Sequence, residues 1–325
     1  MRSLAVSFAS CCAVLLGASA AAQAPPGAFD PSYSPPRLAS GKPDLQGLWS
    51  NALVTPLERP ADLADKEFLT EQEAREYQAK RVAAVNRDAR PDDAAADILL
   101  AYNDFWWDSG TSAVRTLRTS LIVDPPNGRI PELTEAAKQR VAATPPPSAD
   151  GPETQGLSTR CIYYATAGPP MLPGSYNNNY QIVQTDDHVL IVNEMVHETR
   201  IIPLDGRPFP PDEIRQWRGS SRGHWDGDTL VVETRNRRAD TPFRGSSENM
   251  QLTERFTRVA ADVLLYEFTV NDPEAFTQPW TVQITSQRVE DELMYEYACH
   301  EGNKSMSGIL GGARAAERKA AEAAK

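Results

Sequence analysis

Apolar and polar residues alternate with a period of two through most of the chain after residue 180. This period places apolar side chains on one face, so each run predicts a half-buried β-strand. Short turns rich in Asp and Gly separate the runs and favour antiparallel hairpins. The predicted strands cover residues 181–184, 188–202, 229–234, 254–259, 263–270, 280–287 and 292–298. With a strand near Trp49, they predict a mainly β fold, either a calycin-like antiparallel barrel or a strongly curved meander sheet.

The pattern before residue 150 predicts a helical N-terminal portion. Thr70 and Glu73 have the spacing of a capping box, which starts a helix predicted over residues 68–88. Thr134 is placed to cap another helix that ends near residue 143, where a run of prolines breaks the chain. The patterns divide the chain into a signal peptide (1–22), an extended arm (23–46), a first strand with a helical lid or packing region (47–150), an antiparallel β domain (151–307) and a C-terminal helical tail (308–325).

The first residues are typical of a secretory signal peptide. Arg2 precedes a short apolar run over residues 4–16, and small residues follow it. We expect cleavage between Ala20 and Ala24 and a periplasmic or secreted mature protein, with an uncleaved membrane anchor as the alternative. No later segment is apolar enough for stable membrane insertion. The formal net charge of -11 argues against nucleic acid as a partner, because phosphates are bound by basic surfaces.

Export also changes the interpretation of the cysteines. Removal of the signal peptide leaves only Cys161 and Cys299. In an oxidising compartment such a pair most simply forms one disulfide bond. Two buried free thiols or a thiolate ligand are the other interpretations. A disulfide would tie the segment around Cys161 to His300, which follows Cys299 in the chain.

Four segments carry a resemblance to other proteins. They are RTSLIVDPPNGRIP (118–131), RIIPLDGRP (200–208), GHWDGDTLVVET (223–234) and YEYACHEGN (295–303). Together they resemble a large group of exported proteins of Gram-negative bacteria, most of them uncharacterised, over about residues 40–312. The resemblance implies export and assigns no catalytic residue. A weaker likeness, to lipocalin and calycin barrels, rests on Gly47 and Trp49 near the start of a β-rich protein.

Two histidines carry the candidate proton chemistry, because imidazole titrates near neutral pH. His197 is the candidate general acid or base, with Glu194 or Arg200 tuning it. His300 is the candidate second proton-transfer group, and Tyr180 would orient the substrate. On a regular strand Glu194 and His197 would face opposite sides, so they can meet only across a bend. The alternatives are a structural His197 beside an arginine–glutamate pair and a His300 that caps a turn.

Other polar and aromatic residues are candidates for substrate binding. Asn177 and Asn178 offer hydrogen-bond donors and acceptors between two tyrosines, although the sequence favours a loop built on Asx turns. Trp106 and Trp107 could cover a barrel mouth or belong to the core. The remaining candidates lie near a basic stretch that could hold an anion or form a solvated edge: Arg222 and Trp225.

Recognisable nucleotide-binding, hydrolase and zinc-protease sequence signatures are absent from the chain. The sequence therefore predicts a secreted enzyme without an organic cofactor, which acts by histidine acid/base catalysis as a lyase, isomerase or cyclase on a small, largely apolar molecule. One alternative is a lipocalin-like periplasmic binding protein for a lipid or another hydrophobic ligand. The other is a metal-dependent hydrolase in which His197, His300 and nearby carboxylates hold a divalent metal. The sequence carries no signature of a particular oligomeric state.

Overall fold

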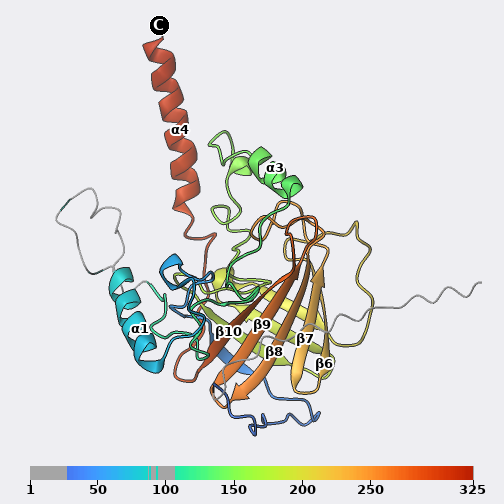
Figure 1. The fold of residues 1–325 in the computed structure, drawn as a ribbon. Coiled ribbons are helices and arrows are strands. Elements are labelled where there is room, and N and C mark those ends of the chain that lie inside the picture. Colours follow the sequence, from blue (N-terminus) through green and yellow to red (C-terminus); the bar gives the residue numbers. More distant parts are fainter. Residues whose placement is uncertain (1–27, 87, 89–92, 94–106, 325) are drawn as a thin grey trace, which may run out of the picture.

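The computed structural model describes residues 28–86, 88, 93 and 107–324, so the predicted signal peptide and Trp106 lie outside the described residues. Within them the fold is mainly β, a ten-stranded antiparallel sheet with three α-helices (Figure 1). The strands are β1 Gly47–Ser50, β2 Ile122–Asp124, β3 Asn179–Gln184, β4 His188–Asn193, β5 Thr199–Pro203, β6 Ser220–Asp226, β7 Thr229–Arg235, β8 Gln251–Ala260, β9 Val263–Asn271 and β10 Trp280–Val289. The helices are α1 Glu71–Val85, α3 Glu135–Ala143 and α4 Lys304–Ala323.

The strands form the predicted curved meander in two parts. The order in the sheet is β5-β4-β3-β1-β10-β9-β8-β7-β6, with β2 paired to β10. The hairpin series β3–β5 and the longer series β6–β10 are therefore joined by β1, which pairs with β3 on one side and β10 on the other. This arrangement confirms a mainly antiparallel, strongly curved sheet.

The sheet is not closed into the calycin-like barrel that was the other expectation. Its edge strands β5 and β6 meet through side chains instead of a backbone ladder. Arg200 Nε donates a hydrogen bond of 3.2 Å to Ser221 Oγ across this seam. Gly223 lets β6 approach closely, because a Cβ there would lie 2.7 Å from Leu204 Cδ2. Side-chain packing thus brings the two edges together.

The inward-facing side chains fill the curved sheet with a hydrophobic core. Its largest fully buried members include Trp49, Tyr180, Tyr266 and Trp280. Tyr266 stacks on Phe256 with ring centroids 4.8 Å apart, and the Trp49 indole donates to the carbonyl of a neighbouring residue. The alternating apolar residues that predict the strands therefore pack against one another, as in a side-chain-filled barrel, and leave this interior to protein atoms.

Local signals place two of the helices. Thr70 caps α1, its hydroxyl accepts from the Glu73 amide, and the Glu73 carboxylate accepts from the Thr70 amide, so the capping box is confirmed. Thr134 caps α3 through the amide of Ala137. The C-terminal helix α4 begins at Lys304, earlier than the predicted residue 308. Asn303 caps it by accepting a hydrogen bond from the Met306 amide. In Figure 1 α4 extends away from the sheet.

The prediction of a strand over residues 292–298 is wrong. The structure has an irregular segment there, between the end of β10 and the start of α4. β10 is already paired with β9 on one side and with β1 and β2 on the other, so a following strand finds no free partner on it. The helices of the described region include none with the length and apolarity needed to cross a bilayer.

Candidate functional site

A pocket of about 1000 Å³ opens where five separate segments of the chain meet. We call it the acidic pocket. It is lined by Ser50, Trp107, Asp108, Tyr176, Asn177, Asn179, Glu194, Val289, Glu292 and Tyr297. All of the formal charges among these residues are negative and belong to three carboxylates, Asp108, Glu194 and Glu292. Aromatic walls around a few converging polar groups are typical of a small-molecule site.

A tight turn aims Glu194 at this pocket. The sequence predicts one continuous strand over residues 188–202, and the structure contradicts this at its centre. β4 ends at Asn193, and Val196 and His197 adopt positive φ angles of 55° and 43° before β5 begins. The β-branched Val196 in this conformation is strained, a feature found preferentially at functional sites. The alternation of faces therefore does not apply to Glu194.

The β3 backbone holds the turn and the carboxylate together. The Glu194 amide donates to the Asn179 carbonyl at 2.9 Å, and the Asn179 amide donates to Glu194 Oε2 at 3.3 Å. This reciprocal pair fixes the carboxylate at the pocket with little freedom. One carboxylate oxygen has a backbone donor, and the side chain still lines the cavity.

Two of the three carboxyl groups have raised pKa values. Burial raises the pKa of the Glu194 carboxyl, and the negative charges of Asp108 and Glu292 raise it further. Burial also raises the pKa of Asp108, again with a contribution from Glu292. Hydrogen bonds from Asn179 and Asn177 to Glu194, and from Asn178 to Asp108, oppose these shifts without cancelling them. The pocket thus holds protonatable groups whose charged forms are disfavoured.

Asn178 builds the wall of the pocket instead of lining it. It is buried, and its Oδ1 accepts from the Gly174 amide at 2.6 Å. Its Nδ2 donates to the carbonyl of Asp108, and the Asp108 amide donates to the Ser175 carbonyl at 2.8 Å. These bonds join residues 107–110 to residues 174–178. We call this pair of segments the wall.

Three aromatic rings line the pocket, two from the wall and Tyr297 from the segment before α4. Trp107 packs edge-on against Tyr176, with ring centroids 5.8 Å apart. Tyr176 in turn stacks on Tyr297 at 6.2 Å, and Tyr297 packs edge-on against Tyr164 at 6.1 Å. Such rings can hold a flat apolar body or a cation.

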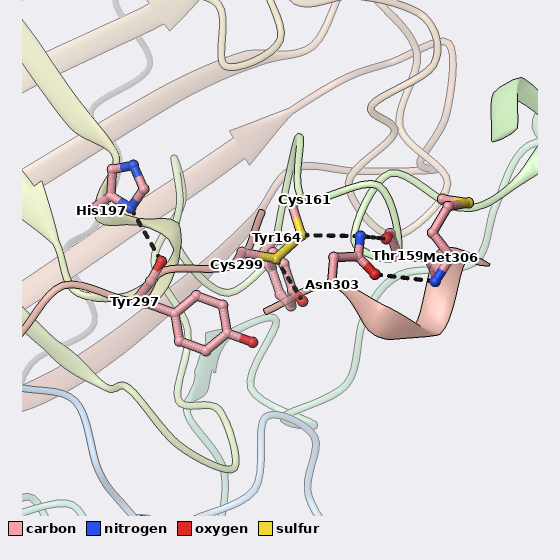
Figure 2. The surroundings of a disulfide bond; sticks show 8 residues. All are labelled: Thr159, Cys161, Tyr164, His197, Tyr297, Cys299, Asn303 and Met306. Carbon is pink, nitrogen blue, oxygen red and sulfur yellow. Dashed lines mark hydrogen bonds between the residues drawn. A yellow bond between two sulfur atoms is a disulfide. The ribbon is translucent and has the colours of Figure 1, made fainter. Parts of the chain in front are cut away.

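The predicted disulfide is confirmed and anchors this aromatic side. Cys161 and Cys299 are bonded, with their Cα atoms 5.7 Å apart and a separation of 138 positions in the sequence. Cys299 follows Tyr297 by two residues, so the bond fixes the irregular segment that carries Tyr297 (Figure 2). Asn303 adds a hydrogen bond of 2.9 Å from its Nδ2 to the Thr159 carbonyl.

The two candidate histidines lie beside the site but do not line it. His197 points at the C-terminal segment, where its Nδ1 lies 3.1 Å from the Tyr297 carbonyl oxygen (Figure 2). Its side chain is 51% exposed and 3.9 Å from a Glu296 carboxylate oxygen. His300 is exposed in the turn that follows the disulfide. Both therefore flank the segment that carries Tyr297, and Glu194 is the candidate that reaches the pocket.

Arg200 and Tyr180 occupy the core instead of the pocket. Arg200 is buried and forms a bidentate ion pair with Glu254, which is fully buried. Tyr266 donates a further hydrogen bond of 2.8 Å to the same carboxylate. Tyr180 is buried and donates to Ser286 Oγ at 2.8 Å, and burial raises the pKa of its phenol well above the usual range. These surroundings favour structural roles, because a buried charge needs its partner.

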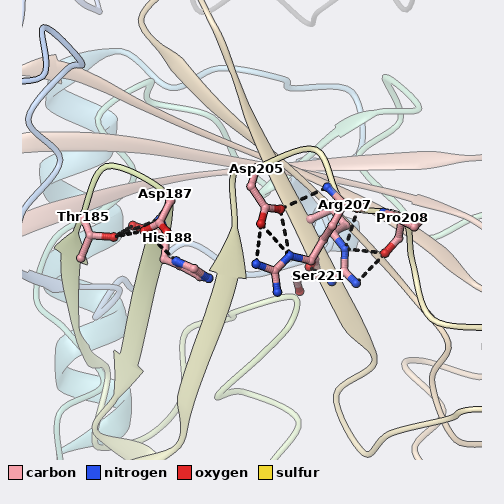
Figure 3. A network of polar contacts seen from close by, with 8 residues as sticks. Thr185, Asp187, His188, Asp205, Arg207, Pro208 and Ser221 are labelled. Carbon is pink, nitrogen blue, oxygen red and sulfur yellow. Dashed lines mark hydrogen bonds and ion pairs between the residues drawn. The ribbon is translucent and has the colours of Figure 1, made fainter.

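The remaining binding candidates lie at the β5–β6 edge. Arg222 donates to the carbonyls of Arg207 and Pro208, the latter at 2.8 Å, and so holds the loop between β5 and β6. The surrounding turns close on themselves through bonds such as Arg207 to Asp205 (Figure 3). Trp225 packs against the core. Neither Arg222 nor Trp225 lines the acidic pocket, whereas Trp107 and Asn177 do.

Sequence reasoning missed Asp108, Glu292 and the part that the wall plays in building the pocket. Asp108 ends the aromatic block that contains Trp107, so that block was the available signal. No sequence signal pointed to Glu292, because it lay in the strand predicted over residues 292–298. Among the described residues, no group of three or more His, Cys, Asp and Glu side chains is arranged to hold a metal ion. No known protein family and no curated protein matches this chain.

Proposed function

We propose that this chain is an exported enzyme that transfers a proton on a small molecule bound in the acidic pocket, without an organic cofactor. The observation that carries the proposal is Glu194, a carboxylate with a raised pKa that is held at the pocket by β3. A general acid or base works best when its pKa lies near the working pH, and burial moves a carboxyl in that direction.

Glu194 takes the role that the sequence suggested for His197. As a carboxylate it would remove a proton from the bound molecule, and as a carboxylic acid it would return one at another position. Asp108, the second carboxyl with a raised pKa that lines the pocket, is the proposed partner. Such a sequence is redox-neutral and corresponds to an isomerase, cyclase or lyase.

His197 is proposed as a positioning residue. Its contact with the Tyr297 carbonyl couples the turn that carries Glu194 to the segment that carries Tyr297. Loss of the ring would loosen both sides of the pocket while leaving the proton-transfer group in place.

The lining also restricts the substrate class. Three carboxylates without a cationic residue among the lining side chains repel anions. The stacked rings favour a flat, largely apolar molecule that is neutral or positively charged. Export to the periplasm or beyond, which the N-terminal sequence predicts, is consistent with the disulfide.

Native mass spectrometry of the mature protein purified from its own cell envelope, followed by turnover assays on the retained compound, tests the proposal. Glu194→Gln is expected to lower kcat roughly 10²–10⁴-fold, the usual contribution of a general acid or base. Glu290→Gln, an exposed carboxylate just after β10, is the matched control and is expected to keep wild-type turnover. His197→Ala is expected to raise KM more than it lowers kcat.

Full turnover by Glu194→Gln together with loss of turnover in His197→Ala would restore the histidine as the catalytic group. The aromatic walls also suit a second function, the binding of a ligand without conversion. That function would be supported by a single retained compound that the wild-type protein leaves chemically unchanged.

A further inference from the structure

A second pocket, of about 470 Å³, uses the same wall as the acidic pocket. Trp107, Asp108, Tyr176 and Asn177 line the acidic pocket, whereas Ser109, Gly174 and Ser175 line the second one. The hydrogen bond from the Asp108 amide to the Ser175 carbonyl joins the two segments that separate the cavities. We call the second cavity the arginine pocket.

The formal charges that line the arginine pocket are both positive. They belong to Arg81 on α1 and to Arg244 in the loop between β7 and β8, and no carboxylate is among the lining residues. Within the described part of the chain, neither guanidinium is in an ion pair. By contrast Arg75, also on α1, lies 3.7 Å from Glu71. Arg81 and Arg244 therefore give this cavity two positive charges that can attract an anionic ligand.

Arg244 is held in place by its turn. Its backbone has a φ of 55°, and the flanking residues lock the turn, since the Phe243 amide donates to Ser246 Oγ at 2.8 Å and the Ser246 amide donates to the Phe243 carbonyl at 3.0 Å. The Phe243 ring is buried against Trp280 at 5.8 Å. A left-handed arginine is costly unless the surroundings enforce it, so the locked turn fixes the backbone position from which Arg244 reaches the cavity.

The rest of the cavity is apolar with a few hydroxyl groups. Its buried lining includes Leu53, Val54, Leu121 and Leu172. Hydroxyl groups come from Thr55, Thr166, Ser109 and Ser175. A fully hydrated ion such as inorganic phosphate would gain nothing from the leucines. An organic anion would bury its apolar body on them and place its head at the arginines.

We infer that the arginine pocket binds a small amphiphilic carboxylate, with the carboxylate between Arg81 and Arg244 and the aliphatic body on the leucine floor. This site does not depend on the proposed chemistry of the acidic pocket. The two cavities would therefore take ligands of opposite charge on either side of one wall.

Calorimetric titration of the full mature chain with decanoate, at low ionic strength, tests the inference. Decanol serves as the neutral probe with the same chain. The double variant Arg81→Gln/Arg244→Gln is expected to weaken decanoate binding at least roughly tenfold, because charge-assisted hydrogen bonds are lost. Decanol binding is expected to change less than about twofold, since the apolar floor is untouched.

The matched control is Arg75→Gln/Arg255→Gln, which changes the net charge equally. Arg75 shares α1 with Arg81, and Arg255 lies on β8 in an ion pair of 3.0 Å with Asp226. Wild-type decanoate affinity in this control supports the site. The inference is overturned if the wild-type protein does not bind decanoate, if both double variants weaken it equally, or if the arginine variant weakens decanol as much as decanoate. Thermal unfolding of each variant reports whether its fold is intact.

Discussion

The acidic pocket and the arginine pocket have a common wall and opposite charge. Within the wall, Asp108 lines one cavity and the next residue, Ser109, lines the other. The two pockets share the wall, and most of their charged side chains come from the segments that pack against it on either side. Glu194 and Glu292 come to one side, while Arg81 and Arg244 come to the other. A single backbone layer can therefore separate two electrostatic environments.

The two pockets also differ in what holds them. The acidic pocket depends on the irregular segment before α4, which is tied to the body by the disulfide and by Tyr297 stacking. The arginine pocket depends on the helix α1 and on the locked turn around Arg244. Changes to one set of anchors should therefore separate the two sites.

The largest expected effect comes from removing the disulfide. Cys161→Ser/Cys299→Ser should lower the free energy of unfolding by about 2–5 kcal/mol, because the bond closes a long loop in the unfolded chain. Urea unfolding measures this. Ligand retention in the acidic pocket should fall, while decanoate affinity in folded protein should stay at the wild-type value. An equal loss at both pockets would show that the arginine pocket shares the same anchor.

A smaller loss of stability is expected from Asn178→Ala. The change leaves the Gly174 amide and the Asp108 carbonyl without their side-chain partner, at a cost of about 1 kcal/mol because both hydrogen bonds are only part-buried. Both pockets should be affected, because Asn178 joins the two segments of the wall. Asn177→Ala is the matched control and should affect only the acidic pocket. The comparison fails if Asn178→Ala leaves ligand binding in both pockets unchanged in titrations of folded protein.

The smallest effect is a gain of stability in Glu194→Gln. A carboxyl whose pKa is higher in the folded than in the unfolded protein binds protons more readily when folded, so stability falls as pH rises through that window. Removing the charge should raise the free energy of unfolding at pH 7 by about 0.5 kcal/mol, a low value because Glu194 is only half-buried. The gain should vanish near pH 4, where Glu194 is protonated.

Thermal unfolding of wild type, Glu194→Gln and the exposed control Glu290→Gln at both pH values measures this difference. A destabilised Glu194→Gln at pH 7 would mean that the charged form is favoured in the folded protein. That result would also remove the basis for treating Glu194 as a proton-transfer group.

Most of the elements were predictable because their signals are local. The capping box at Thr70 and the alternation along β8, β9 and β10 depend on residues only a few positions apart. The same local reasoning failed at residues 194–198 and 292–298. In the first a strained turn interrupts an apolar alternation, and in the second a strand-like sequence follows a strand with no free neighbour.

The candidate site was only partly predictable. Glu194, Asn177 and Trp107 were singled out by sequence and line the acidic pocket, but Glu194 was considered only as a group that tunes His197. Asp108 and Glu292 escaped notice, because an isolated carboxylate in a sequence carries no information about the distant segments that it will meet. The pKa of a carboxyl depends on desolvation and on nearby charges, and both arise only when distant segments meet.

By itself the sequence determined a mainly antiparallel β protein, the helix caps and the pairing of Cys161 with Cys299. These features follow from local hydrogen bonding, from side-chain alternation and from the small number of cysteines outside the predicted signal peptide. Only the tertiary structure decided that the sheet stays open, that Arg200 serves the core, and that carboxylates and arginines gather on opposite sides of one wall. Those outcomes depend on contacts between residues far apart in the chain, which no short pattern encodes.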